Sequence, residues 1–108
     1  MSRVTNLLII FSTLENENNI IAEMSNYIIN GNNFNILSIN DERMPQDWYG
    51  GTKRLECNVL IGAYNYLDLG PFLAFLRTEV SWEAADLVQV FVKEQNDMKF
   101  RLIDLIPC

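Results

Sequence analysis

Apolar and polar residues follow one another along the chain in a pattern that predicts alternating strands and helices. Residues 5–11 (TNLLIIF) form a short apolar run rich in strand formers, which predicts a buried strand. Apolar residues then recur at helical spacing. Ser12 and Glu15 have the spacing of a capping box before this segment, and Asn30-Gly31 is a typical helix stop after it. We therefore expect a first helix over residues 15–30.

The rest of the chain continues this rhythm. Residues 34–40 alternate in polarity as an edge strand does, and Pro71 stands early in a second apolar helical stripe, where its missing N–H costs nothing. The stretch between them is long for so small a domain, and loops of that length are usually functional or mobile. We expect strands over residues 34–40, 56–66, 87–94 and 99–106, a long loop over residues 41–55, and a second helix over residues 69–79.

This order of elements, β-α-β-β-α-β-β, is typical of the split βαβ or ferredoxin-like arrangement with one added hairpin strand. Right-handed crossovers would give a five-stranded antiparallel sheet ordered 5-4-1-3-2, with both helices on one face. A chain of 108 residues is long enough for one two-layer core. The expected fold is a single α+β domain over residues 1–108.

The helix-free face of such a sheet is expected to be unusually apolar. The first strand is apolar on both of its sides, and the fourth carries apolar residues on both faces as well. Alternation in the third strand sets Leu60 and Tyr64 opposite Val59 and Ile61, and we place Tyr64 on the helix-free face. Apolar faces of this size are seldom left in water. The cover could be the 41–55 loop, a second copy of the chain or another partner. We expect a homodimer through this open face.

Composition narrows the range of functions that the chain can have. Eight Lys and Arg against 14 Asp and Glu give a net charge of −6, which argues against binding a nucleic-acid backbone and favours a basic protein partner, or simply aids solubility. No apolar run approaches the roughly 20 residues of a membrane helix, and the amino end lacks the pattern of a signal peptide. Cys57 and Cys108 lie far apart and are expected to be free thiols. The expected compartment is the cytoplasm.

The predicted topology gathers acidic residues at one end of the domain. The connectors after the first strand, the second strand and the second helix would all lie there. These connectors and their flanks form what we call the acidic pole, with carboxylates at Glu15, Glu17, Asp41, Glu42, Asp47, Glu79, Glu83 and Asp86. Arg43, Lys53, Arg54 and Arg77 oppose them.

Aromatic residues share these connectors, and Trp and Tyr commonly anchor protein interfaces. The same pattern also fits aromatics that cover the core beside solvated acids. As candidate partner-binding residues we select Asp41, Glu42, Asp47, Trp48, Tyr49, Glu79, Trp82, Glu83 and Asp86.

Catalytic signals are weak. The chain has no His, which removes the commonest general base, a serine triad and most zinc sites. Residues 50–53 (GGTK) lack the spacing of a phosphate loop and precede a strand instead of a helix. Asp41 and Glu42 could bind a metal or act as acid and base, but nothing in their spacing separates them from a solvated loop. We expect no catalytic residue, no metal site and no cofactor.

Three segments carry a resemblance to known proteins: residues 48–51 (WYGG), 62–66 (GAYNY) and 92–95 (VKEQ). Together they resemble small bacterial proteins, some of which are similar to the immunity proteins encoded beside contact-dependent growth-inhibition toxins. The resemblance implies a cytoplasmic, often acidic, non-catalytic inhibitor that binds a cognate toxin nuclease, for instance an RNase. Immunity proteins share no common fold, so no family residue is carried over.

Two other classes stay open. One is a dimeric ferredoxin-like enzyme or small-ligand-binding module that uses a cleft between the open face and the long loop. The other is a structural subunit of a larger assembly.

Overall fold

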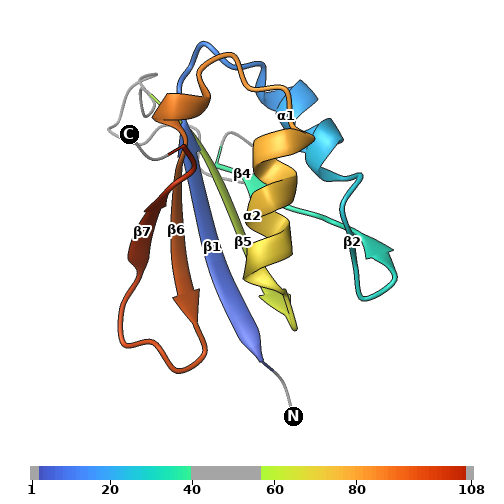
Figure 1. Ribbon diagram of the computed structural model, residues 1–108, viewed down its shortest axis with the longest axis vertical. Helices are drawn as coiled ribbons and strands as arrows, with labels where there is room; N and C mark the ends of the chain where they lie inside the picture. Colours follow the sequence, from blue (N-terminus) through green and yellow to red (C-terminus); the bar gives the residue numbers. More distant parts are fainter. Residues whose placement is uncertain (1–2, 40–56, 107–108) are drawn as a thin grey trace, which may run out of the picture.

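The computed structural model describes residues 3–39 and 57–106 and shows an antiparallel sheet with two α-helices (Figure 1). In chain order the elements are β1 (Val4–Phe11), α1 (Glu17–Met24), β2 (Ile28–Ile29), β3 (Asn32–Asn33), β4 (Leu37–Ser38), β5 (Asn58–Asn65), α2 (Leu69–Thr78), the 3₁₀ turn η1 (Ala85–Leu87), β6 (Gln89–Glu94) and β7 (Arg101–Asp104). The expected α+β class, with two helices and a five-stranded antiparallel sheet, is confirmed.

The main sheet has the order β4-β5-β1-β6-β7, and every neighbouring pair is antiparallel. β1 lies at its centre and pairs with β5 over its whole length and with β6 over six residues. A separate two-stranded sheet joins β2 to β3. None of the helices in the described ranges is long and apolar enough to cross a membrane.

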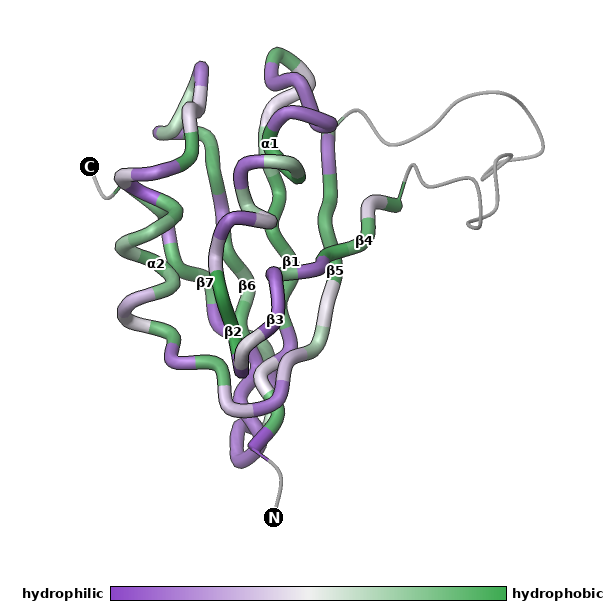
Figure 2. Tube along the Cα trace, turned by 90° about the vertical axis from the view of Figure 1, so that its right-hand side faces the viewer, coloured by the Kyte–Doolittle hydropathy of each residue, from purple (hydrophilic) through white to green (hydrophobic). Residues whose placement is uncertain are grey.

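One face of the main sheet carries the core. Leu7, Ile9 and Phe11 of β1 are buried, whereas the alternate residues Leu8 and Ile10 are only partly covered. α1 and α2 lie on one side of β1 and β5 (Figure 2). They contribute their buried residues, among them Ile20 and Phe72, to the same cluster as Leu7 and Phe11. The helices therefore cover the face that the odd-numbered residues of β1 present.

The first helix is shorter than the sequence predicts. Its N-cap is Asn16, whose side chain accepts a hydrogen bond of 3.2 Å from the Asn19 N–H, so the expected capping box at Ser12 and Glu15 is wrong. The helix ends at Met24. Asn30 and Gly31, with φ angles of 52° and 79°, form the turn between β2 and β3. Asn-Gly is the preferred pair for a two-residue hairpin turn with two positive φ angles. The pair therefore turns the β2–β3 hairpin and does not end the first helix, as the sequence had predicted.

Tyr64 lies on the helix face, not on the open face where the sequence analysis placed it. It pairs with Thr5, which is buried, and its own exposure is 9%. The ring stacks on Phe34 with centroids 4.5 Å apart, and the hydroxyl donates a hydrogen bond of 2.7 Å to the Asn35 carbonyl. Burial raises the pKa of the Tyr64 phenol. The prediction that Tyr64 lies on the same side of β5 as Leu60 is correct. That side faces the helices, because Leu60 pairs with the buried Ile9.

The other expected elements differ from the structure mainly at their ends. α2 ends one residue before the expected end of residues 69–79. The expected strand over residues 34–40 is reduced to β4, because Phe34 and Ile36 turn into the core before the pairing with β5 begins. The expected loop over residues 41–55 lies outside the described residues.

Candidate functional site

Two connectors meet at the end of the sheet where β1 and α2 end (Figure 1). They are residues 12–16, between β1 and α1, and residues 79–88, between α2 and β6. The Glu15 carboxylate joins them, because its Oε1 and Oε2 accept hydrogen bonds of 2.8 Å each from the backbone N–H groups of Glu83 and Ala84. The expectation that these two connectors gather at one end is confirmed.

Glu15 supports this end of the domain from within. Its side chain is buried, with an exposure of 6%. A buried carboxylate is tolerated where N–H groups satisfy its oxygens, and hydrogen bonds to a charged group are the stronger kind. Glu15 was counted among the carboxylates of the acidic pole, but it is turned inward and presents no charge to a docking partner.

Glu23 and Trp82 also fix the same connector. Glu23 of α1 accepts a hydrogen bond of 3.1 Å from the Ser81 N–H. The Trp82 indole N–H donates to the Leu76 carbonyl at 2.8 Å, and its ring meets Phe11 edge-on with centroids 5.3 Å apart. The connector is therefore held by α1, by the end of α2 and by β1, which makes it a rigid support.

Three acidic side chains stand outward from this support. Glu79 is the C-cap residue of α2, Glu83 follows Trp82, and Asp86 lies in η1; all three are exposed. We call Glu79, Glu83 and Asp86 the acidic connector. Trp82 is half-buried, so part of its ring covers the core and part reaches the surface. The other candidate partner-binding residues lie outside the described residues: Asp41, Glu42, Asp47, Trp48 and Tyr49.

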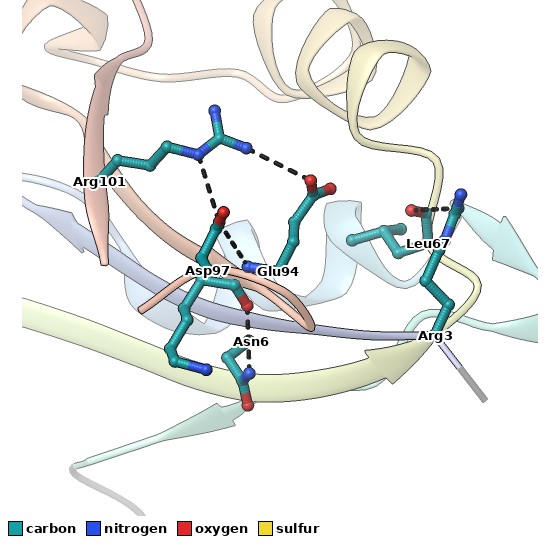
Figure 3. Close-up of polar contacts among 7 residues, drawn as sticks. Arg3, Asn6, Leu67, Glu94, Asp97 and Arg101 are labelled. Carbon is teal, nitrogen blue, oxygen red and sulfur yellow. Dashed lines mark hydrogen bonds and ion pairs between the residues drawn. The ribbon is translucent and has the colours of Figure 1, made fainter. Parts of the chain in front are cut away.

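The acidic connector forms no ion pair with another described residue. The ion pairs that join two described residues both involve Arg101, which lies 3.4 Å from Glu94 and 3.5 Å from Asp97 (Figure 3). Those residues belong to the β6–β7 hairpin and not to the connector. Arg77, the nearest cation in sequence, donates its Nε–H to the Leu105 carbonyl at 2.7 Å. No ion pair within the described ranges offsets Glu79, Glu83 or Asp86.

A cavity of about 290 Å³ lies beside the β4–β5 pair. The described residues of its lining are Asn35, Ile36, Leu37, Ile61 and Gly62, none of which has an ionisable side chain. Residues 3–39 and 57–106 contain no group of three or more Asp, Glu, Cys or His residues arranged to hold a metal. The described part of the cavity lining therefore supplies no acid, base or nucleophile.

Sequence reasoning found the acidic connector but missed the carboxylates that hold it. Glu15 and its partners are 68 and 69 residues apart, and Glu23 and Ser81 are 58 apart. No local motif marks a carboxylate that binds the backbone of so distant a segment.

Comparison with known proteins gives no relative. The chain matches no family model, no curated protein and no solved structure.

Proposed function

We propose that this protein is a non-catalytic immunity protein that binds a basic toxin domain and occludes its active site. The observation that carries the proposal is the acidic connector: three exposed carboxylates, Glu79, Glu83 and Asp86, on a backbone that buried and half-buried side chains hold in place. The toxin would be a nuclease, for instance an RNase, and the compartment the cytoplasm.

The chemistry of the connector fits such a partner. A nuclease active site carries Lys and Arg that bind phosphate groups, and carboxylates can take the place of those phosphates. Opposite surface potentials steer association and raise its rate. Because the connector is already ordered, binding costs little conformational entropy there. The exposed part of Trp82 would add apolar contact beside Glu83.

The rest of the candidate interface belongs to this proposal as an expectation. Asp41, Glu42, Asp47, Trp48 and Tyr49 would extend the acidic connector into a larger surface. We further propose that the fold is a ferredoxin-like one with an added edge strand, which the sheet order and the antiparallel pairing of all neighbours support.

The test uses the protein encoded by the adjacent gene, since immunity genes stand beside their toxin genes. Co-expression of the two should restore the growth that the neighbour alone suppresses. A surface-binding assay should show association that slows as salt rises toward physiological strength, where the Debye length is about 8 Å. Failure to restore growth, or binding insensitive to salt, would contradict the proposal.

A matched pair of charge reversals locates the interface. Glu83→Lys and Asp68→Lys change the net charge equally. Asp68 precedes α2, whose 10 residues separate it from the acidic connector, a distance of roughly 15 Å along the helix axis. We expect Glu83→Lys to weaken binding at least about tenfold, because a like charge then faces the basic partner, and Asp68→Lys to change it little. Equal effects of the two variants would mean that net charge alone acts.

A further inference from the structure

The outer edge of β7 pairs with no other strand of the described residues. Among those strands β7 ends the sheet, and it pairs with β6 on its inner side. Leu105 donates its N–H to the Val88 carbonyl at 3.1 Å, so the odd-numbered residues of this segment direct their backbone groups toward β6. In an antiparallel ladder the alternate residues direct theirs the other way. Leu102 and Asp104 therefore present N–H and C=O groups outward along the free edge.

Exposed apolar side chains are concentrated in the same region. Within the described ranges, five of the eight exposed large apolar side chains belong to residues 87–106: Leu87, Met98, Phe100, Leu102 and Ile106. Leu102 is 48% exposed and pairs with Phe91, so both lie on the open face of the sheet. Edge strands are usually protected against pairing by charges, prolines or bulges. In β7, Leu102 stands exposed between Arg101 and Ile103.

The charge of this hairpin also permits self-association. Residues 89–104 contain three cations, Lys93, Lys99 and Arg101, and three anions, Glu94, Asp97 and Asp104, which sum to zero. The chain as a whole carries −6. Two copies that meet at β7 bring two neutral hairpins together, which keeps the repulsion between them low.

We propose that a second copy of this chain pairs antiparallel with β7 about a two-fold axis and extends the sheet from five strands to ten. With this two-fold axis, each residue of β7 lies opposite a residue of the partner copy whose side chain is on the same side of the sheet. With Leu102 opposite the partner's Leu102, Asp104 faces the partner's Phe100 and Arg101 faces the partner's Ile103. No like charges oppose one another in this register. The register that centres on Asp104 places two carboxylates opposite each other, which disfavours it.

This arrangement gives the open face a different role from the one expected from sequence. The two copies lie edge to edge, and Phe91 and Leu102 of each copy form one apolar strip across the junction. Two strands thereby satisfy one another's outward backbone groups, while the central leucines are withdrawn from water. The proposal is independent of the proposed function, because β7 contains none of the candidate partner-binding residues.

Cross-linking tests the pairing and its register. In a background with Cys57→Ser and Cys108→Ser, Leu102→Cys should form a covalent dimer on mild oxidation. Directly opposed hydrogen-bonded residues have Cα atoms about 5.5 Å apart, within the range of a disulfide. Asp104→Cys in the same background should not cross-link, because it faces the partner's Phe100. Cross-linking through position 104 in place of 102, or through neither, would overturn the proposal.

Sedimentation velocity gives the second measurement. The parent should sediment as a dimer, and Leu102→Asp should raise the dimer dissociation constant about a hundredfold or more, because two carboxylates then face each other. Leu14→Asp is the control, since Leu14 is 75% exposed and lies outside the hairpin. Circular dichroism should show both variants folded. A parent that stays monomeric at every concentration, or a dimer that survives Leu102→Asp, would show that β7 does not pair with itself.

Discussion

Glu15 accepts a hydrogen bond of 2.8 Å from the backbone N–H of Glu83, so a buried carboxylate holds the segment from which an exposed carboxylate projects. Both residues are glutamates, but they have different roles. Glu15 is fixed by its two backbone partners and is withdrawn from solvent, whereas Glu83 points its charge outward. Glu83 contributes to the charge of the acidic connector, and Glu15 contributes to its order.

Replacing Glu15 by Gln tests this support. The amide keeps one good acceptor and turns an NH₂ group toward the other backbone N–H. Hydrogen bonds to charged groups contribute roughly 1.5–3 kcal/mol, so we expect the free energy of unfolding to fall by about 2 kcal/mol. Urea denaturation at neutral pH measures the change.

Glu23→Gln is the matched control for Glu15→Gln. Glu23 makes a single hydrogen bond to the connector, at 3.1 Å, and is less buried than Glu15. Its substitution should cost clearly less. If the two variants lost the same free energy of unfolding, the special role of Glu15 would be refuted.

Tyr64→Phe isolates the hydrogen bond between the Tyr64 hydroxyl and the Asn35 carbonyl. The ring keeps its stacking on Phe34, so only the 2.7 Å bond is lost. We expect a loss of about 1 kcal/mol in the free energy of unfolding. Tyr66→Phe serves as the control, because Tyr66 is 49% exposed. Equal stability of parent and Tyr64→Phe would indicate that water replaces the Asn35 bond without cost.

Gly62→Ala tests how closely the Tyr64 ring covers the β5 backbone. A Cβ at position 62 would collide with the hydroxyl and ring atoms of Tyr64, which Phe34 and Asn35 hold in place. Overpacking of this kind costs about 1–3 kcal/mol. In the background of Tyr64→Ala the same substitution should cost much less, so a double-mutant cycle by urea denaturation should show strong coupling. Additive effects would mean that the ring moves aside freely.

Asp97 gives the β6–β7 hairpin a dependence on pH. The hydrogen bond from the Glu94 N–H, at 2.9 Å, lowers the pKa of Asp97, and Arg101 lowers it further. A lowered pKa in the folded state stabilises the protein above the unfolded value of about 4. This stabilisation is lost as the pH falls through the lowered pKa.

We therefore expect Asp97→Asn to reduce stability at neutral pH and to match the parent in strong acid. Thermal unfolding followed from neutral pH downward would show the two curves converging. Asp86→Asn, an equal chemical change at an exposed site, should leave stability nearly unchanged across the same range. Curves that stay parallel below about pH 4 would contradict the assignment.

The elements that the sequence predicted well are those whose signal is local and strong. The apolar run of β1 and the apolar stripe of α2 are both found close to their expected bounds. Asn30-Gly31 shows the limit of such signals. The same dipeptide ends helices and turns hairpins, and only the pairing of Ile28 with Asn33 decides between the two uses.

The candidate site depended on contacts that no local pattern contains. Alternation in β5 separated its two faces, but the choice of the buried face rests on the pairing of Leu60 with Ile9 and on the stacking of Tyr64 with Phe34. The exposure of Glu83 was expected from its place in a connector. The burial of Glu15 could not be, because its partners lie at the other end of the sequence.

The central position of β1 has a consequence for how the chain folds. Its neighbours in the sheet are β5 and β6, which begin at residues 58 and 89, so each pairing closes a long loop. Contacts between distant segments slow folding. During synthesis, Leu7, Ile9 and Phe11 emerge from the ribosome well before either neighbour exists. Until β5 and β6 are made, this apolar strand has both edges open, and unpaired apolar strands of this kind are prone to aggregate.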